Sequence, residues 1–237
     1  MPETISSLVA LIKQAPAPVV LLDTCALLDI VRASHREELS GEGVEAALSL
    51  AERARQHPRG AWLVVAEVVD REWTDNWEHV VEEARRAIGQ LERRMDKLRS
   101  VAKHVVPLET IAALDLNRLQ IHEHLKTAAH ALLKLANIIE LDPDAIMRAR
   151  TRLTTGTPPA AKGKQEFKDC EIFEHYLALG RALQADGFQQ DLFFVSSNTR
   201  DYGTPGKLLP ELEADLRSAR MQLITSFAWL NAVLNRH

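Results

Sequence analysis

The sequence predicts an α/β protein of three layers, in which helices cover both faces of a central parallel sheet of four to five strands. Short apolar runs rich in Val, Leu and Phe alternate along the chain with segments of helical periodicity, as in strand–helix–strand units. These runs are continuous and do not alternate with polar residues, which indicates strands buried on both sides. At 237 residues the chain is long enough for one substantial core, so we expect a single domain over residues 1–237.

The first half of the chain contains two expected strands, each followed by helix. The run at residues 17–22 (APVVLL) is short and preceded by prolines, which predicts a buried strand. Asp23 and Thr24 come next and can cap a helix. The elements expected in this half are strands at residues 17–22 and 62–65 (WLVV) and helices at residues 25–32, at 44–56 and from about residue 67.

The long helix that begins near residue 67 carries an apolar stripe that steps by threes and fours. A later helix repeats this heptad spacing, which needs a helical partner to bury it. We therefore expect an antiparallel helical pair that forms an extension at about residues 74–140. The stripe positions are Trp77, Val81, Ala84, Ile88, Leu91, Met95, Leu98 and Ala102, and then Ile121, Leu125, Ala128, Leu132, Leu135 and Ile139. The segment His104 to Leu108 is a connector or a short strand, and the strand is favoured.

The second half of the chain completes the sheet. Residues 141–165 contain several prolines and glycines and little periodicity, which predicts a short helix followed by a mobile loop. Residues 166–183 return to helical spacing. Two further strands are expected at residues 191–196 (DLFFVS) and 221–225 (MQLIT).

Composition and charge favour a globular protein of the cytoplasm. Hydrophobic residues make up 46% and charged residues 26%, and no apolar run is long enough to span a bilayer. The two cysteines, Cys25 and Cys170, cannot form a disulfide framework, and their helical spacing predicts small core residues. The net charge of −4 hides a basic segment, because residues 145–165 hold five basic residues and no acid.

Acidic residues gather at the places where parallel strands of one sheet would bring them together. Asp23 ends the first strand, Glu67 and Glu72 follow the second, and Asn198 and Asp201 follow the strand at residues 191–196. Asp169 comes from the start of a helix. Each of them has a structural alternative as a helix cap or a turn residue, so only the combination is informative.

Clustered carboxylates repel one another unless cations neutralise them. Oxygen-only ligands suit Mg²⁺ or Mn²⁺, and such ions can activate water and stabilise the leaving oxygen of a phosphodiester. The acids therefore predict a divalent-cation site. Glu67 and Glu72 are five residues apart and cannot share one helix face, so only one of them should belong to it.

Four blocks of this sequence resemble the blocks of a PIN domain. They are VVLLDTCALLDI with Asp23, AEVVDREW with an acid in the helix after the strand, KGKQEFKDCEIFEHYLAL with Asp169, and FFVSSNTRDYG with its polar turn. Glu72 fits the second block better than Glu67. The resemblance covers most of the chain, and residues 152–169 are similar to the loop of a subgroup of uncharacterised bacterial PIN-like proteins with a long helical insertion.

The fourth block departs from the family pattern. It usually reads Thr-x-Asp-x-Asp, whereas here Asn198 stands near the first Asp position and Asp201 follows three residues later. The fourth ligand is therefore Asp201 directly, Asn198 through its carbonyl oxygen, or both through water.

The resemblance implies a metal-dependent endoribonuclease that cuts single-stranded RNA with Mg²⁺ or Mn²⁺, in some members as the toxin of a toxin–antitoxin pair. It implies that Asp23, Glu72, Asp169 and Asp201 are catalytic and bind the metal together with Asn198. The residues expected to bind RNA are Thr24, Arg150, Arg152, Lys162, Lys164, Lys168 and Thr199.

Two other functions stay open. One is a catalytically inactive PIN-like module that binds RNA or protein, which Asn198 in the fourth block would allow. The other is a protein-interaction module in which the helical pair is the working part and the acids are caps. An inhibitory protein partner and a homodimer are further alternatives for the assembly.

Overall fold

A computed structural model describes residues 1–105, 115–160 and 167–236. Within them lies a parallel five-stranded sheet of order β3-β2-β1-β4-β5. The strands are β1 (Val19–Leu22), β2 (Trp62–Ala66), β3 (Asn137–Ile139), β4 (Leu192–Val195) and β5 (Met221–Ile224). Every residue of β1, β2 and β4 is buried, which is why their sequences are continuous apolar runs. The predicted fold class is confirmed.

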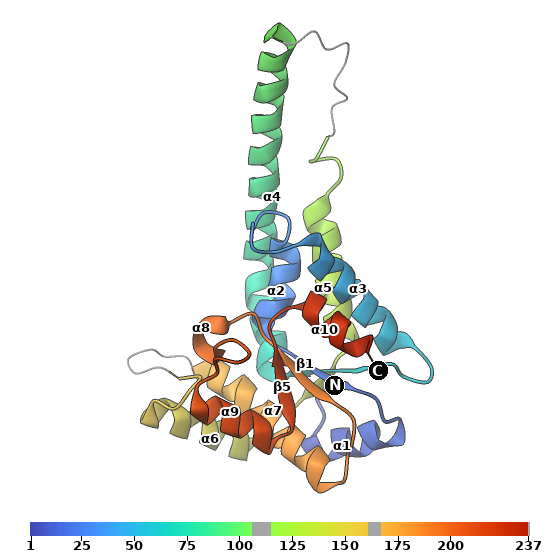
Figure 1. The fold of residues 1–237 in the computed structure, drawn as a ribbon, viewed down its shortest axis with the longest axis vertical. Coiled ribbons are helices and arrows are strands. Elements are labelled where there is room, and N and C mark those ends of the chain that lie inside the picture. Colours follow the sequence, from blue (N-terminus) through green and yellow to red (C-terminus); the bar gives the residue numbers. More distant parts are fainter. Residues whose placement is uncertain (106–114, 161–166, 237) are drawn as a thin grey trace.

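Helices cover both faces of this sheet. Figure 1 shows one group formed by α1, α6, α7 and α9 and a second group formed by α2, α3, α5 and α10, with the sheet between them. The helices are α1 (Ile5–Gln14), α2 (Thr24–Arg32), α3 (Gly41–Arg55), α4 (Glu67–Val105), α5 (Ile121–Leu135), α6 (Pro143–Thr155), α7 (Phe167–Ala185), α8 (Thr199–Tyr202), α9 (Pro210–Ser218) and α10 (Phe227–Leu234).

The predicted helical pair is present, but the two helices differ greatly in length. α4 has 39 residues and α5 has 15, and α5 also packs against α2 and α3. The buried residues of α4 end at Ile88. Beyond it the helix projects from the body of the molecule (Figure 1), and four of its apolar side chains are exposed: Leu91, Leu98, Val101 and Val105. The expectation that α5 buries the whole stripe is therefore wrong, because α5 is too short.

Two expectations about strands near this pair need correction. His104 and Val105 are the last residues of α4, so they are not part of a strand, and the rest of that predicted segment lies outside the described residues. Ile139 belongs to β3 and pairs with Ala66 of β2. Helical periodicity had placed Ile139 in the preceding helix, because a short apolar segment after a helix fits either structure.

The segment after β3 begins as predicted with a short helix, α6, whose N-cap Asp142 accepts hydrogen bonds from the backbone of Asp144 and Ala145. The mobile loop expected after it falls largely on residues 161–166, which lie outside the described residues. No helix in the described parts of the chain has the length and apolarity needed to cross a membrane.

Candidate active site

The candidate site lies where the strand order changes direction. From β1 the chain proceeds to β2 on one side, and it later returns to β4 on the other side of β1. Ligands of open α/β sheets bind in the crevice beyond the carboxyl ends of two such strands. Here the Tyr176 hydroxyl of α7 joins the ends of β1 and β2, because it donates to the Leu22 carbonyl at 2.5 Å and accepts from the Ala66 backbone N–H at 3.2 Å.

Asp23 lies in this crevice, at the end of β1, with only 3% of its surface exposed. Its backbone N–H donates to the Val195 carbonyl of β4 at 3.0 Å, which fixes the residue between the two strands. The Ser196 hydroxyl donates to Asp23 Oδ2 at 2.5 Å, and the Cys25 thiol donates to the same oxygen at 3.1 Å.

The carboxyl group of Asp23 is electrostatically strained. Burial raises its pKa most, and the nearby charge of Glu72 raises it further. The hydrogen bonds from Ser196 and Cys25 act in the opposite direction, but the net shift is upward. Burial and the charge of Asp23 also raise the pKa of Cys25, so its sulfur stays a neutral thiol and a donor.

Glu72 reaches Asp23 from the second turn of α4. Its Oε2 accepts from the Thr24 hydroxyl at 2.7 Å, and its Oε1 lies 3.1 Å from the Lys168 ammonium. Three helices, α2, α4 and α7, therefore meet at this carboxylate. The hydroxyl of Thr24 and the charge effect on Asp23 tie Glu72 to the crevice, whereas Glu67 is the first residue of α4, one and a half turns earlier.

Asp169 and Asp201 are linked to this pair through neighbouring residues. The Tyr202 hydroxyl donates to the Asp169 backbone carbonyl at 3.2 Å. Burial raises the pKa of Tyr202 most, followed by the charges of Asp23 and then Asp169, so both acids lie near the same phenol. Asp201 Oδ2 accepts from the side-chain amide of Asn198 at 2.8 Å.

Ser196 links these groups and was not singled out from the sequence. Its Oγ donates to Asp23 and accepts from the Asn198 backbone N–H at 3.2 Å. It also lies 3.3 Å from the Cys25 sulfur. Ser196 is buried and joins the end of β4 to the turn that carries Asn198 and Asp201. Cys170 is buried as predicted, whereas Cys25 is partly exposed and its thiol contacts Asp23, so Cys25 is more than a small core residue.

The donor atoms of this site suit a hard divalent cation. Carboxylates and hydroxyls supply oxygen atoms, and the positive charge described at Glu72 is the ammonium of Lys168. Within the described residues, however, no group of three or more His, Cys, Asp or Glu side chains lies close enough to hold a metal ion. The structure thus pairs Asp23 with Glu72 without gathering all four acids into one cluster.

The residues predicted to bind RNA fall into different environments. Thr24 is buried and occupied with Glu72, and the Lys168 side chain is 56% exposed at the rim of the site. Arg150 is exposed on α6, and Thr199 is exposed at the start of α8. Lys162 and Lys164 lie outside the described residues.

Arg152 does not lie on the surface as predicted. It is 7% exposed and holds three elements together through Nε to Glu174 of α7, Nη2 to Asp215 of α9 and Nη1 to the Pro158 carbonyl, each at 2.5 Å. All three nitrogen atoms of its guanidinium group are engaged, so Arg152 is not available to a phosphate. The sequence could not show this, because its acidic partners lie 22 and 63 residues away.

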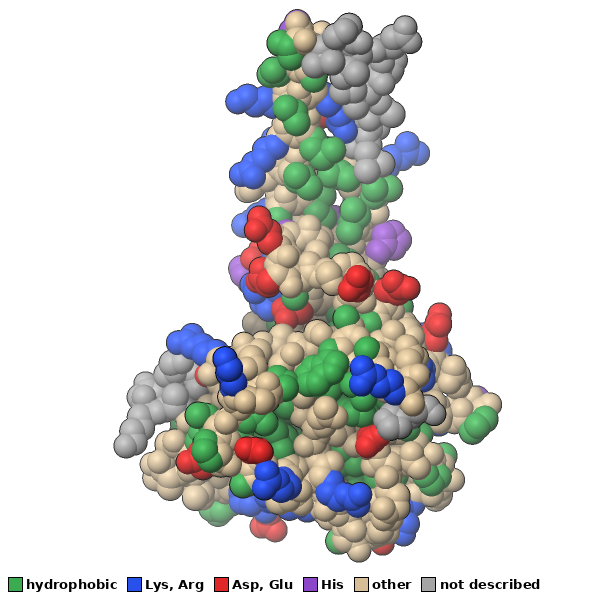
Figure 2. Space-filling model, viewed as in Figure 1, with side chains coloured by type: hydrophobic (Ala, Val, Ile, Leu, Met, Phe, Trp, Pro, Cys, Tyr) green, Lys and Arg blue, Asp and Glu red, His purple; other side chains and the backbone are tan. Residues whose placement is uncertain are grey.

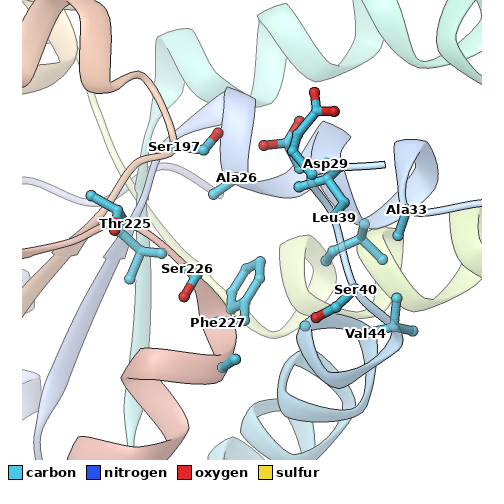
Figure 3. Close-up of a pocket in the computed structure, with 15 residues that line it drawn as sticks. Ala26, Asp29, Ala33, Leu39, Ser40, Val44, Ser197, Thr225, Ser226 and Phe227 are labelled. Atoms are coloured by element: carbon cyan, nitrogen blue, oxygen red, sulfur yellow. The ribbon is translucent and has the colours of Figure 1, made fainter. Parts of the chain in front are cut away.

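A pocket of about 230 Å³ lies beside the acids. Figure 3 shows Ala26 of α2, Ser197 after β4 and Thr225 after β5 around it, with the ring of Phe227 on its other side. Ala26 and Ser197 each directly follow a residue that bonds to Asp23, namely Cys25 and Ser196. The pocket and the acids therefore share one end of the sheet.

The comparison with known protein families agrees with this geometry. A family model described as PIN domain matches residues 20–202. No curated protein and no solved structure gives a match. The matched region covers most of the chain and includes Asp23, Glu72, Asp169 and Asp201. The chain therefore belongs to the PIN-domain family, whose members are in general metal-dependent nucleases.

Proposed function

We propose that this protein is a metal-dependent endoribonuclease that cuts single-stranded RNA. The observation that carries the proposal is the meeting of Asp23 and Glu72 at the switch point of the sheet, where the pKa of the buried Asp23 is raised. Two acids held this close repel each other, and a divalent cation would relieve that repulsion. Asp169 and Asp201, with Asn198, would complete the ligands.

Each residue of the proposed site has a defined task. Asp23 and Glu72 would hold Mg²⁺ or Mn²⁺, kept in place by Ser196 and Thr24 respectively. The cation, when bound, activates water and neutralises charge on the phosphodiester. When RNA binds, the Lys168 ammonium would leave Glu72 and contact a phosphate. The exposed Arg150 and Thr199, together with Lys162 and Lys164, would contact the backbone further along.

The test compares two variants of the same helix. Glu72→Gln is expected to abolish Mg²⁺-dependent cleavage of a single-stranded RNA, whereas Glu67→Gln keeps it, because only Glu72 is tied to Thr24 and Asp23. EDTA is expected to stop cleavage by the wild type, and added Mn²⁺ to restore it. Cleavage that survives EDTA would rule out the metal mechanism, and an inactive Glu67→Gln with an active Glu72→Gln would reverse the assignment of the two acids.

A second function has its own support. Asn198 occupies one oxygen of Asp201, and the described residues contain no group of three or more potential ligands around one point. Both facts favour a PIN-like module that binds RNA or protein without cutting it. This alternative predicts RNA binding in the absence of divalent cations and no cleavage in their presence.

A further inference from the structure

The projecting part of α4 presents three exposed cations that form no ion pair with an acid of the described residues. Arg93, Arg94 and Lys97 line a shallow surface groove together with Gln90. Among the described residues, no carboxylate lies within ion-pair distance of these three, whereas Arg85, Arg86 and Arg99 of the same helix pair with Glu82 or Asp96. Like charges three and four residues apart destabilise a helix. The three cations therefore lower the stability of the isolated helix, and an anionic ligand would relieve their repulsion.

The trio lies on the same face of α4 as the active-site acid. Arg94 follows Glu72 by 22 residues and Lys97 by 25, which are about six and seven turns of about 3.6 residues, so both point in nearly the same direction as Glu72 from the axis. At a rise of about 1.5 Å per residue, the trio and Glu72 are about 32–38 Å apart along the helix. Figure 1 shows α4 extending from the body, and Figure 2 shows Lys and Arg side chains along the projecting part.

Neighbouring side chains define the rest of this face. His35 and Arg36, from the connection between α2 and α3, line a second hollow together with Gln90, Leu91 and Arg94. Between this region and Glu72 lie two acids, Asp75 and Glu83, and Glu83 is 3.6 Å from His35. A polyanion would therefore touch the helix at the trio and at the active site, and pass over the stretch between them.

Charge decides which partner fits. A second copy of α4 would place the same cations against one another, which is unfavourable. We propose that Arg93, Arg94 and Lys97 form a second contact site for the phosphate backbone of the RNA that the active site cuts. At about 3.4 Å per nucleotide of stacked strand, the two sites are about ten nucleotides apart. This inference rests on the proposed function and adds a preference for long substrates.

The test is RNA binding by a triple variant, Arg93→Gln with Arg94→Gln and Lys97→Gln, in the non-cleaving Asp23→Asn background. Glutamine is a good helix former, so the helix is expected to persist, which circular dichroism checks. The matched control replaces three exposed cations off this face, Arg85, Lys103 and Arg217, by Gln. Each protein is titrated with a 6-nucleotide and a 20-nucleotide single-stranded RNA over a range of salt concentrations.

The triple variant is expected to bind the 20-nucleotide RNA more weakly, with a log–log salt slope shallower by about two units, since each lost contact removes about 0.7. Its affinity for the 6-nucleotide RNA should equal that of the control. An unchanged slope, or an equal loss in the control, overturns the proposal, and an acidic protein then becomes the better occupant. If the wild-type protein cleaves RNA but the triple variant binds the 20-nucleotide RNA as tightly as the control does, this inference alone is overturned. If the wild-type protein neither binds nor cleaves RNA, the proposed function is overturned as well.

Discussion

At the scale of single residues, the site depends on a carboxyl group in an unfavourable place. Asp23 is buried at the end of β1 next to Glu72, and both burial and that charge raise its pKa above 3.8. Ser196 and Cys25 compensate only in part. Such a group lowers the stability of the empty protein and increases its attraction for a cation. Function and stability thus compete at one residue.

This competition predicts that Asp23→Asn stabilises the metal-free protein while it removes cleavage. Well below pH 3.8 the carboxyl group is protonated in both the folded and the unfolded chain, so its ionisation does not affect the free energy of unfolding. As the pH rises from there to the raised folded pKa, the unfolded chain ionises first and stability is lost. The gain in unfolding free energy for Asp23→Asn should therefore be absent towards pH 4 and grow with pH until the pH exceeds the raised folded pKa, at about 1.4 kcal/mol per unit of pKa shift.

Urea unfolding in EDTA at several pH values between 4 and 7 measures this gain. The Asn oxygen can still accept from Ser196, so the comparison isolates the charge. A variant less stable than the wild type at pH 7 would mean that the hydrogen bonds to the charged carboxylate outweigh its burial.

At the scale of elements, the sequence showed what depends on local pattern and missed what depends on neighbours. β1, β2 and β4 were predictable because each is a continuous apolar run, and Asp23 and Glu72 because each follows one of these strands. Ser196 was not, since its bond to Asp23 depends on β4 lying beside β1. β3 was missed because it has only three residues and its last residue, Ile139, continues the apolar spacing of α5. The exposure of the apolar side chains at the end of α4 was also missed, because it depends on the length of the partner helix α5.

Arg152 illustrates how three helices are joined by one residue, and its removal should destabilise the fold. In Arg152→Met, Glu174 stays buried and loses one of its two charge partners in α6, while Arg148 still contacts it. Breaking a buried ion pair from one side costs about 3–5 kcal/mol. Urea unfolding is expected to show a loss of this order, reduced by the remaining contact with Arg148.

Arg150→Met is the matched control for this change, because Arg150 lies on the same helix and is exposed. It should alter the unfolding free energy by no more than about 0.5 kcal/mol. For RNA affinity we expect the reverse: Arg150→Met lowers it, and Arg152→Met leaves it unchanged. Equal stability of the two variants would show that the Arg152 contacts contribute little.

At the scale of the whole molecule, one hydrophobic core connects the first helix to the last. The core cluster extends from Leu8 of α1 to Leu234 of α10 and includes Val80 and Val81 of α4. We propose that residues 1–237 form one domain, and that the extension at about residues 74–140 unfolds together with the rest on heating. Heating should then give one transition, with the same midpoint by far-ultraviolet circular dichroism and by the fluorescence of the buried Trp62 and Trp73. Two separate midpoints would make the extension a second folding unit.

A bound cation should appear in the stability of the whole chain as well as in cleavage. A ligand that binds only the folded state adds RT ln(1 + [L]/Kd), which is about 2.7 kcal/mol when its concentration is 100 times Kd. For a chain of this size, each kcal/mol raises Tm by about 2–4 °C, so saturating Mg²⁺ is expected to raise Tm by about 5–10 °C. Asp23→Asn should lose most of this rise, because it removes a ligand at the centre of the site.

Differential scanning fluorimetry over a range of Mg²⁺ concentrations measures both proteins, with Ca²⁺ as a comparison cation and added NaCl as the control for ionic strength. A rise of the same size in the wild type and in Asp23→Asn would place the cation elsewhere on this acidic protein. Because the readout needs no RNA, it separates metal binding from catalysis. An Mg²⁺-dependent rise in the wild type without RNA cleavage would therefore favour the binding module over the nuclease, even though the same acids hold the ion.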